Sequence, residues 1–312
     1  MTRPATMKEP PPLRAGDRVA LFSPSSHQGR YPPGYPQQAA DLLSGWGLRV
    51  EPLAEPRKHL YLAGTDAQRA EEFQRLYQDP AIKALFCTRG GYGAARLLPL
   101  LDRAAIANAP PKWVVGFSDL TALFAYLHGA AGTTAMHGPC LAAPGATESP
   151  RREENLEALR AALFGQTRPA YAVRWLRPPP GGPTEIAAPI VGGCLSVLVT
   201  TLGTPWEVDT RGTILFLEDT DEAPYRVDRM VTHLRTAGKL NNVRAVVLGS
   251  FHNCDGDPPG LLDQALAELF RDATFPVAMG LPCGHGDLNL PLVLGAEARL
   301  FADGDSARLH QV

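Results

Sequence analysis

Short apolar runs that each end in a polar or glycine-rich turn recur through the first half of the chain. They read RVALFSP (18–24), IKALFCTRGGYG (82–93) and KWVVGFSD (112–119). Each run has the length of a buried strand, and the second and third are followed by helical patterns, the first of these over 94–101. The other helix has one apolar face, made by Leu120, Leu123, Phe124 and Leu127, and glycine stops at Gly129 and Gly132. Strands alternating with helices predict a parallel sheet with these turns at the carboxyl ends of its strands.

The composition changes after this region. The segment 174–189 is rich in proline and glycine and has no helical period, so we expect a linker over 169–189. Strand-like runs follow at 213–219, 244–251 and 275–287, with a helical stripe between the first two formed by Val227, Met230, Val231 and Leu234. A chain of 312 residues is long for one core. We therefore expect an α/β fold with an N-terminal parallel-sheet domain (1–168) and a smaller C-terminal α/β domain (190–312).

Overall composition excludes several classes of protein. The formal net charge is −2, so no basic surface points to nucleic acid or to an anionic membrane. No segment approaches the roughly 20 apolar residues of a membrane helix, and the N-terminal stretch lacks a signal-peptide pattern. The five cysteines are an odd number at irregular spacing, which favours a reducing compartment: Cys87, Cys140, Cys194, Cys254 and Cys283. We expect a cytoplasmic protein.

Ser118 is the first candidate for chemistry. It lies at the junction of an apolar strand and a helix, where a sharp turn would expose its hydroxyl and place the following N–H, that of Asp119, as an oxyanion donor. The sequence G-F-S-D-L lacks the final glycine of G-x-S-x-G. The competing interpretation is that Ser118 or Asp119 caps the helix.

A nucleophilic serine requires a base and an acid. His285 is the foremost base, because Gly284 and Gly286 flank it just past an apolar strand; His137 and His252 are weaker rivals. The acids at 218–222 follow another strand, and Glu218 could orient an imidazole. A divalent-metal site and a solvated acidic turn are the alternatives for this cluster.

Two other motifs have alternative interpretations. The loop TRGGYG (88–93) matches neither a P-loop nor a dinucleotide fingerprint. Its glycines could turn backbone N–H groups toward an anion, or could simply form a tight turn. Four possible zinc ligands, His252, Cys254, Cys283 and His285, lack the C-x-x-C spacing of closed sites, so we expect no metal.

The chain resembles the LD-carboxypeptidase (muramoyltetrapeptide carboxypeptidase) family. Ordered blocks from Arg14 to Gly295 carry this resemblance: LRAGDRVALFSPSS, TRGGYGAARLLPLLD, VVGFSDLTALF, MHGPCLA, IVGGCLSVLVTTLGTPWEVD, TILFLEDTDEAPYRVDRMVTHL and GLPCGHGDLNLPLVLG. Two positions depart from the family pattern: Phe22 stands where a smaller residue is frequent, and Cys194 stands where Asn is expected. Because the Cys194 position could line the cleft, this departure bears on substrate specificity.

The resemblance implies a function and a site. Ser118 would be the nucleophile, Glu218 the orienting acid and His285 the general base, in a cleft between the domains. The N–H groups of Asp119 and of Gly91 or Gly90 would form the oxyanion hole. The implied reaction releases the terminal D-alanine of murein tetrapeptides, free or UDP- or anhydromuramoyl-linked, during cell-wall recycling. A homodimer without metal or organic cofactor is also implied.

Other functions remain open at this point. The same family includes peptidases that cleave peptidyl-nucleotide antibiotics of the microcin type to give self-immunity. A non-catalytic ligand-binding module and a zinc hydrolase are further alternatives. For the substrate's carboxylate, Arg89 and Arg226 are candidates because a guanidinium binds a carboxylate through two hydrogen bonds; each could instead serve a structural ion pair.

Overall fold

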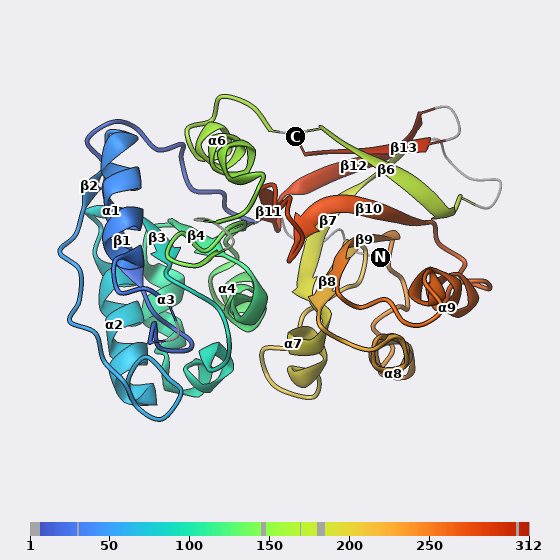
Figure 1. The fold of residues 1–312 in the computed structure, drawn as a ribbon, viewed down its shortest axis with the longest axis horizontal. Coiled ribbons are helices and arrows are strands. Elements are labelled where there is room, and N and C mark those ends of the chain that lie inside the picture. Colours follow the sequence, from blue (N-terminus) through green and yellow to red (C-terminus); the bar gives the residue numbers. More distant parts are fainter. Residues whose placement is uncertain are drawn as a thin grey trace.

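Strands of two separate sheets organise the two halves of the molecule (Figure 1). The computed structural model describes residues 7–29, 31–144, 148–168, 170–179, 185–303 and 306–311. The first half contains a six-stranded sheet in the order β11-β5-β4-β3-β1-β2. Its strands are β1 (Arg18–Phe22), β2 (Arg49–Val50), β3 (Ile82–Cys87), β4 (Trp113–Gly116), β5 (Ala135–His137) and β11 (Leu292–Leu294). All pair in parallel except β11, which runs antiparallel to β5.

Helices cover both faces of this sheet because its strands bury side chains on both sides. Phe86 and Val115 pack in the cluster that includes α1 (Tyr35–Gly45) and α6 (Arg152–Leu163). Leu85 and Val114 belong to the cluster on the opposite face, which includes three helices: α2 (Asp66–Gln78), α3 (Arg103–Asn108) and α4 (Thr121–Ala131). The predicted parallel α/β domain is therefore confirmed.

Two expected helices differ in detail. The helix predicted over 94–101 is a pair of short 3₁₀ helices, η1 (Ala94–Arg96) and η2 (Leu98–Leu100), since Pro99 has no N–H with which to continue an α-helical ladder. The next one opens with a 3₁₀ turn, η3 (Ser118–Leu120), before α4. It ends where predicted, at Gly132, whose φ of 59° suits a left-handed cap.

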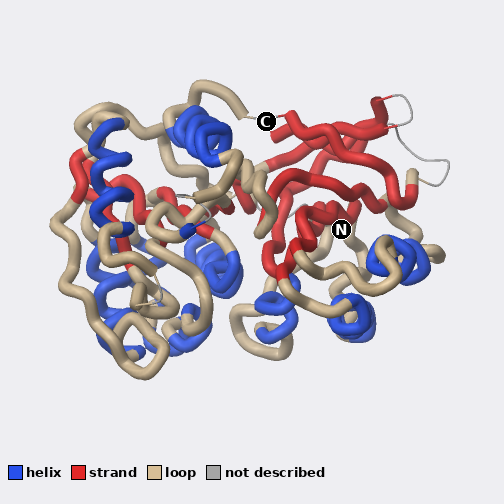
Figure 2. The backbone as a smooth tube through the Cα atoms, in the orientation of Figure 1, coloured by secondary structure: helices blue, strands red, loops and turns tan. Residues whose placement is uncertain are grey.

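The second half is a closed barrel in the order β10-β6-β13-β12-β7-β8-β9. Its strands are β6 (Ala170–Arg177), β7 (Glu185–Cys194), β8 (Ile214–Thr220), β9 (Ala245–His252), β10 (Val277–Gly284), β12 (Glu297–Asp303) and β13 (Ser306–Gln311). Strands β7 to β10 pair in parallel, and the other pairs are antiparallel. Helices α7 (Leu195–Thr200), α8 (Pro224–Thr236) and α9 (Leu261–Leu269) lie along one side of the barrel (Figure 2). Val227, Val231 and Leu234 of the predicted stripe are buried there.

The expected linker over 169–189 was wrong where the structure describes it. Strand β6 and the start of β7 occupy this stretch; residues 169 and 180–184 lie outside the described residues. The buried Tyr171 and Val173 alternate with exposed neighbours along β6, so the strand has a period of two that its flanking prolines obscure. In addition, β11 leaves the C-terminal half to pair with the first sheet. No helix in the described ranges is both long and apolar enough to cross a membrane.

Candidate functional site

Ser118 adopts a backbone conformation that few serines share. Its φ is 64°, whereas the preceding Phe117 is extended with a φ of −158°. A left-handed conformation costs a non-glycine residue about 1–2 kcal/mol, and such strain is typical of a nucleophile held on a sharp strand-to-helix turn. Phe117, not Ser118, occupies the N-cap position of η3, and no side-chain capping bond forms there. The sharp turn, rather than helix capping, accounts for this serine.

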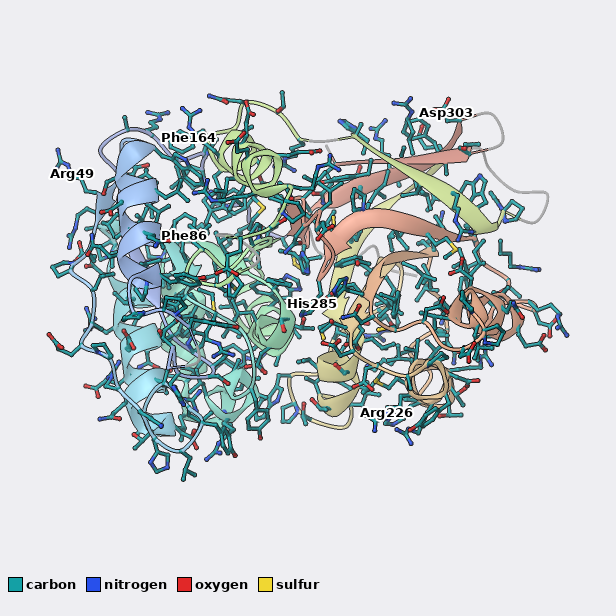
Figure 3. The ribbon with its side chains drawn as sticks, in the orientation of Figure 1. Arg49, Phe86, Phe164, Arg226, His285 and Asp303 are labelled. Atoms are coloured by element: carbon teal, nitrogen blue, oxygen red, sulfur yellow. The ribbon has the colours of Figure 1, made fainter. Side chains whose placement is uncertain are left out.

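Ser118 is one of the residues that line a pocket of about 450 Å³, and residues of both halves form this pocket. Tyr31, Arg89 and Gly90 come from the first half, whereas Thr220, His285 and Asn289 come from the second. Figure 3 shows His285 between the two halves of the fold. The cleft therefore lies at the carboxyl ends of β3, β4, β8 and β10, as expected for parallel strands.

Glu218 and His285 form a close pair in this cleft. Nδ1 of His285 lies 2.7 Å from Oε2 of Glu218, which is fully buried on β8. With Nδ1 engaged, Nε2 is the ring nitrogen left for a reacting group. Gly284 permits the approach: a Cβ atom there would lie 2.6 Å from Oε2 of Glu218, so no other residue fits at this position without displacing the carboxylate.

The charges of this pair support each other. Burial alone would raise the pKa of Glu218, but His285 and His137 outweigh it and hold that pKa well below its ordinary value. Burial alone would lower the pKa of His285, but the Glu218 carboxylate outweighs it and the pKa lies above its ordinary value. Glu218 is consequently a carboxylate at neutral pH that favours the imidazolium form of His285.

Ser118 and His285 share the pocket, and the ring of Phe117 lies 4.7 Å from the ring of His285. The structure thus brings a strained serine next to an imidazole–carboxylate pair drawn from the other half. This combination suits nucleophilic acyl transfer, in which an imidazole accepts the serine proton.

The TRGGYG loop packs directly against Ser118. A Cβ atom on Gly90 would lie 3.0 Å from Cβ and 3.2 Å from Oγ of the serine. The loop is held by Ser26, whose Oγ accepts a hydrogen bond of 3.1 Å from the N–H of Tyr92. Backbone rather than a side chain therefore occupies the space beside the hydroxyl, which is the arrangement that an oxyanion hole requires.

Asp119 contributes a side chain that the sequence analysis missed. Its Oδ2 accepts hydrogen bonds from Ser25 Oγ (2.6 Å) and from the N–H of Ala94 (2.7 Å). Burial raises the pKa of this carboxyl, and these donors partly offset the rise. The residue after the serine thereby ties the glycine loop to the turn, and the only sequence signal was an acid next to a serine.

The acids at 218–222 do not form one cluster. Asp219 is buried and accepts hydrogen bonds from the N–H and Oγ of Ser196, at the start of α7. Asp221 is exposed and accepts one from Asn253. Alternation along β8 turns Asp219 away from Glu218, whereas Asp221 lies beyond the end of the strand, where its φ of 57° marks a turn.

The three candidates for substrate binding are separated in space. Arg89 is buried in the pocket wall, donates to the carbonyl of His27 (2.9 Å) and lies 4.5 Å above the Tyr31 ring. Its Nε has no hydrogen-bond partner among the described residues. Arg226 is exposed on α8, does not line the pocket and pairs with Glu222. Cys194 is buried with its Sγ 3.6 Å from Asp219 and does not line the pocket.

Hydrogen bonds across the halves fix this site. Thr121, at the start of α4, accepts one of 3.0 Å from the N–H of Cys194 through its Oγ1. Asn155 of α6 donates to the carbonyl of Asp287 and accepts from the N–H of Asn289. Asn289 in turn accepts from the N–H of Gly284. The loop that carries His285 is thus braced by a helix of the first half.

The rival histidines and cysteines do not assemble into a ligand set within the described residues. His252 is exposed, and the buried Cys254 donates through Sγ to its carbonyl. Within the described part of the chain, no group of three or more His, Cys, Asp or Glu side chains is arranged as a metal site. His137 is fully buried, with Nε2 3.9 Å from Oε1 of Glu218.

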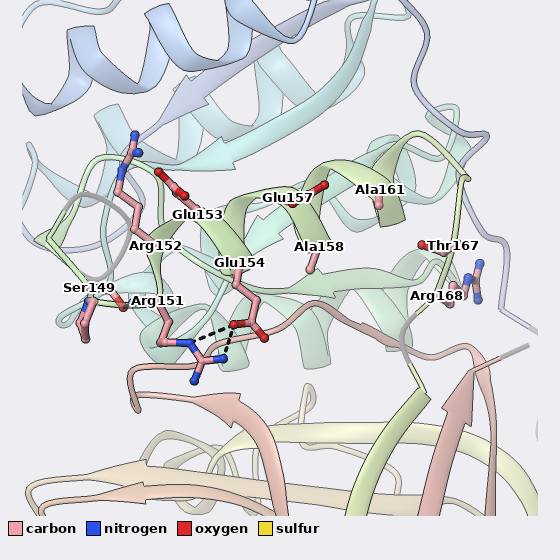
Figure 4. Close-up of a pocket in the computed structure, with 11 residues that line it drawn as sticks. Ser149, Arg151, Arg152, Glu153, Glu154, Glu157, Ala158, Ala161, Thr167 and Arg168 are labelled. Atoms are coloured by element: carbon pink, nitrogen blue, oxygen red, sulfur yellow. Dashed lines mark hydrogen bonds and ion pairs between the residues drawn. The ribbon is translucent and has the colours of Figure 1, made fainter.

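A second pocket, of about 830 Å³, runs along α6 (Figure 4). Arginine and glutamate side chains line it, among them the ion pair of Arg151 with Glu154. Among the described residues that line it, Ser149 and Thr167 carry the hydroxyls and none has an imidazole. These residues therefore provide no serine–histidine pair for nucleophilic chemistry.

Comparisons with known proteins match both halves of the chain to one family. The LD-carboxypeptidase N-terminal domain matches residues 19–138, and the LD-carboxypeptidase C-terminal domain matches residues 187–300. The murein tetrapeptide carboxypeptidase of Pseudomonas aeruginosa is 32% identical over 78% of this chain and 80% of its own. The crystal structure of muramoyltetrapeptide carboxypeptidase from Oxalobacter formigenes has a TM-score of 0.79 at 28% identity, covering 94% of this chain and 98% of that one. The microcin C7 self-immunity protein MccF in its wild-type apo state has a TM-score of 0.84 at 25% identity, covering 96% and 98%.

Proposed function

The chain belongs to the LD-carboxypeptidase family, and we propose that it is a serine carboxypeptidase that releases the terminal D-alanine of murein tetrapeptides during cell-wall recycling. One observation carries this proposal: a serine at φ 64° shares a pocket with a histidine whose Nδ1 is bound to a buried glutamate. The names of the relatives support the substrate class.

In the proposed reaction, Ser118 Oγ attacks the carbonyl carbon of the L,D peptide bond while Nε2 of His285 accepts its proton. Glu218 stabilises the imidazolium that forms. The N–H groups of Asp119 and of Gly91 or Gly90 stabilise the oxyanion. The C–N bond then breaks, D-alanine leaves with the proton from His285, and an acyl ester on Ser118 remains. Water, deprotonated by His285, hydrolyses this ester and restores the serine.

Recognition of the free carboxylate is assigned to Arg89. A carboxypeptidase must select a chain end, and a guanidinium binds a carboxylate through two parallel hydrogen bonds. Arg89 is the candidate that lines the pocket, and its stacking on Tyr31 holds the guanidinium plane in place.

Arg89→Met tests this role. It should raise KM for tetrapeptide about ten- to hundredfold through loss of a charge-assisted contact, with a smaller change in kcat. The variant should also lose the preference for a free carboxylate over a C-terminal amide. Arg226→Met, on the exposed face of α8, is the matched control and should leave both parameters unchanged. An unaltered acid-to-amide preference in Arg89→Met would assign the carboxylate to another group.

Incubation with murein tetrapeptide, followed by mass spectrometry of the products, tests the function itself. Loss of one alanine by wild type, and none by Ser118→Ala, is the expected result. UDP-linked and anhydromuramoyl-linked tetrapeptides belong in the same series, because the proposal includes both. An intact tetrapeptide after incubation with folded wild-type protein would refute the proposed substrate.

Similarity to MccF over 96% of the chain supports a second candidate, a self-immunity peptidase acting on a peptidyl nucleotide. Both activities would use the same three side chains, so substitutions at those positions would affect both alike. A competition assay between the two substrates separates the activities. Tetrapeptide and an aminoacyl-nucleotide amide are offered together, and the larger kcat/KM identifies the function. From the family resemblance we also propose a homodimer, which light scattering tests, and a cytoplasmic location, which fractionation tests.

A further inference from the structure

We propose that His137 is a positioning residue that holds the second carboxylate oxygen of Glu218 and extends the serine–histidine–glutamate set by a fourth member. The inference rests on the proposed function, because it assigns Glu218 a catalytic role. His285 occupies Oε2 of this carboxylate. The other oxygen, Oε1, faces His137.

His137 and Glu218 are both fully buried, and each has polar atoms without a hydrogen-bond partner among the described residues. Neither ring nitrogen of His137 has a hydrogen-bond partner within the described residues, and neither does Oε1 of Glu218. A buried polar group without a partner costs about 1–3 kcal/mol, and more when it is charged. Nε2 and Oε1 are 3.9 Å apart, so an approach of about 1 Å makes a hydrogen bond of ordinary length. An Nε2–H tautomer of His137 would satisfy Nε2 and Oε1 at once and would leave Nδ1 as an uncharged acceptor.

The surroundings restrict where the His137 ring can go. It packs edge-on against Phe216 at 5.1 Å between centroids and lies 5.8 Å from Phe117. Its backbone on β5 pairs with Gly116 of β4 on one side and with Leu292 of β11 on the other. Aromatic and strand neighbours therefore leave the ring aimed at Glu218, in apolar surroundings where a charged hydrogen bond is strong.

This contact joins the sheet of Ser118 to the barrel strand of Glu218. The strand that carries His137 is paired with β4, whose end carries the serine. A donor from β5 to Glu218 on β8 would hold the acid, and hence His285, in register with the nucleophile. It would also spread the negative charge over both oxygens, so that Glu218 remains a carboxylate when His285 becomes an imidazolium.

The effect on His285 has a defined sign. Loss of the His137 donor concentrates charge on Oε2 and favours protonated His285, so the pKa of His285 should rise. Other titratable groups that act on the pair are Asp219 of β8, Cys140 after β5, Cys194 of β7 and Cys283 of β10. All of these groups are present in each variant compared, so a difference between His137→Phe and His137→Gln reports on the donor at position 137.

The experiment compares His137→Phe, which keeps a ring but removes the donor, with His137→Gln, which keeps an N–H. His128→Gln, a change at another histidine whose ring nitrogens are shielded from solvent, is the control. In His137→Phe, kcat should fall about ten- to hundredfold, a loss typical of removing an outer group that orients a functional side chain through a hydrogen bond. KM should change little, and the acid limb of kcat/KM should move to higher pH. His137→Gln should recover most of the activity.

NMR titration of the His285 ring in each variant supplies a readout that needs no substrate. The pKa of His285 should rise by about half a unit or more in His137→Phe and stay near wild type in both glutamine variants. An unchanged pKa in His137→Phe, or an equal loss of kcat in His137→Gln, would overturn the inference. If His137→Phe does not fold, the His137→Gln variant decides the matter. Loss of activity with a shifted pH profile in His137→Gln would overturn the inference, and near-wild-type behaviour would support it. If the wild-type protein does not hydrolyse tetrapeptide, the proposed function is refuted. The inference about His137 is then still tested, because the titration measures the effect of its contact with Glu218 without substrate.

Discussion

Oε2 of Glu218 and Nδ1 of His285 meet at 2.7 Å although 67 residues separate them in the chain. The contact forms because β8 and β10 end at the same edge of the barrel, with β9 between them. It raises the pKa of His285 above its ordinary value even though burial of the ring opposes the rise.

The pH dependence of catalysis follows from this pair. In the proposed mechanism His285 must be neutral to accept the serine proton. We therefore expect kcat/KM to rise with pH through one ionisation that lies above the ordinary histidine value of about 6.5. Removing the anion by Glu218→Gln should move that ionisation to lower pH. It should also reduce kcat by about 10³–10⁴, as expected when a histidine loses its orienting carboxylate. A profile that is flat between pH 5 and 8, with chemistry rate-limiting, would contradict the role of His285.

Ser118→Ala should abolish nearly all turnover while the protein still folds and binds tetrapeptide. In the proposed mechanism the three side chains act together, so Ser118→Ala combined with Glu218→Gln should be little worse than Ser118→Ala alone. Single-turnover assays with the three variants test this. Multiplicative losses would show that the residues act independently.

The backbone of Ser118 gives a separate stability prediction. Glycine tolerates positive φ, so Ser118→Gly should be more stable than Ser118→Ala by about 1 kcal/mol. Urea unfolding of the two inactive variants measures the difference. Equal stabilities would mean that the turn relaxes in the protein and is not strained.

Gly90→Ala should impair catalysis without unfolding the protein. The new Cβ would press on both Cβ and Oγ of Ser118 at 3.0 and 3.2 Å, and displacing a reacting group by a fraction of an ångström should cost about tenfold or more in kcat. Gly129→Ala is the control: no atom lies within 4 Å of its Cβ position. Since Gly129 is inside α4, alanine there should stabilise the protein by about 0.5–1 kcal/mol. Kinetics and thermal melts of both variants test whether position 90 must lack a side chain.

His128 should make the fold sensitive to acid. Both ring nitrogens are out of contact with solvent, and burial lowers the pKa of His128 to about 4, against a small opposing effect of the Leu294 backbone. The unfolded chain therefore binds a proton below pH 6.5 that the folded protein refuses until about pH 4. Stability should fall by about 3 kcal/mol between these values. Urea titrations at pH 7 and 5 should show a smaller loss for His128→Gln than for wild type or for the exposed His233→Gln.

The sequence predicted the parts of the site that a local pattern marks. Ser118, Gly90, Glu218 and His285 each follow an apolar run, and the carboxyl ends of parallel strands meet at one edge. His137 and the carboxylate of Asp119 were not predicted as partners, because their contacts cross from one sheet or loop to another. Arg226 and Cys194 fit a carboxylate or a cleft by residue type alone, and only tertiary placement sets them apart from Arg89.

The barrel was harder to foresee than the first sheet. An open parallel sheet repeats one local unit of strand and helix. The barrel closes through the local hairpin of β12 and β13 and through antiparallel pairs of β6 and β7 with segments 100 or more residues away. No short window of sequence contains that information. The prolines beside β6 further obscure its alternation of buried and exposed residues.

The return of β11 to the first sheet limits how the chain can be divided. A fragment that stops at residue 168 contains the nucleophile and its loop, yet it leaves β5 as an edge with unpaired N–H and C=O groups where Leu292, Val293 and Leu294 belong. Exposed edges of this kind pair with other chains and promote aggregation. The reciprocal fragment exposes the apolar side chains of that strand, which are buried in the intact protein. Split versions of this protein would therefore recover solubility only where the two pieces recombine, and such recombination would restore the edge and the cleft in a single step.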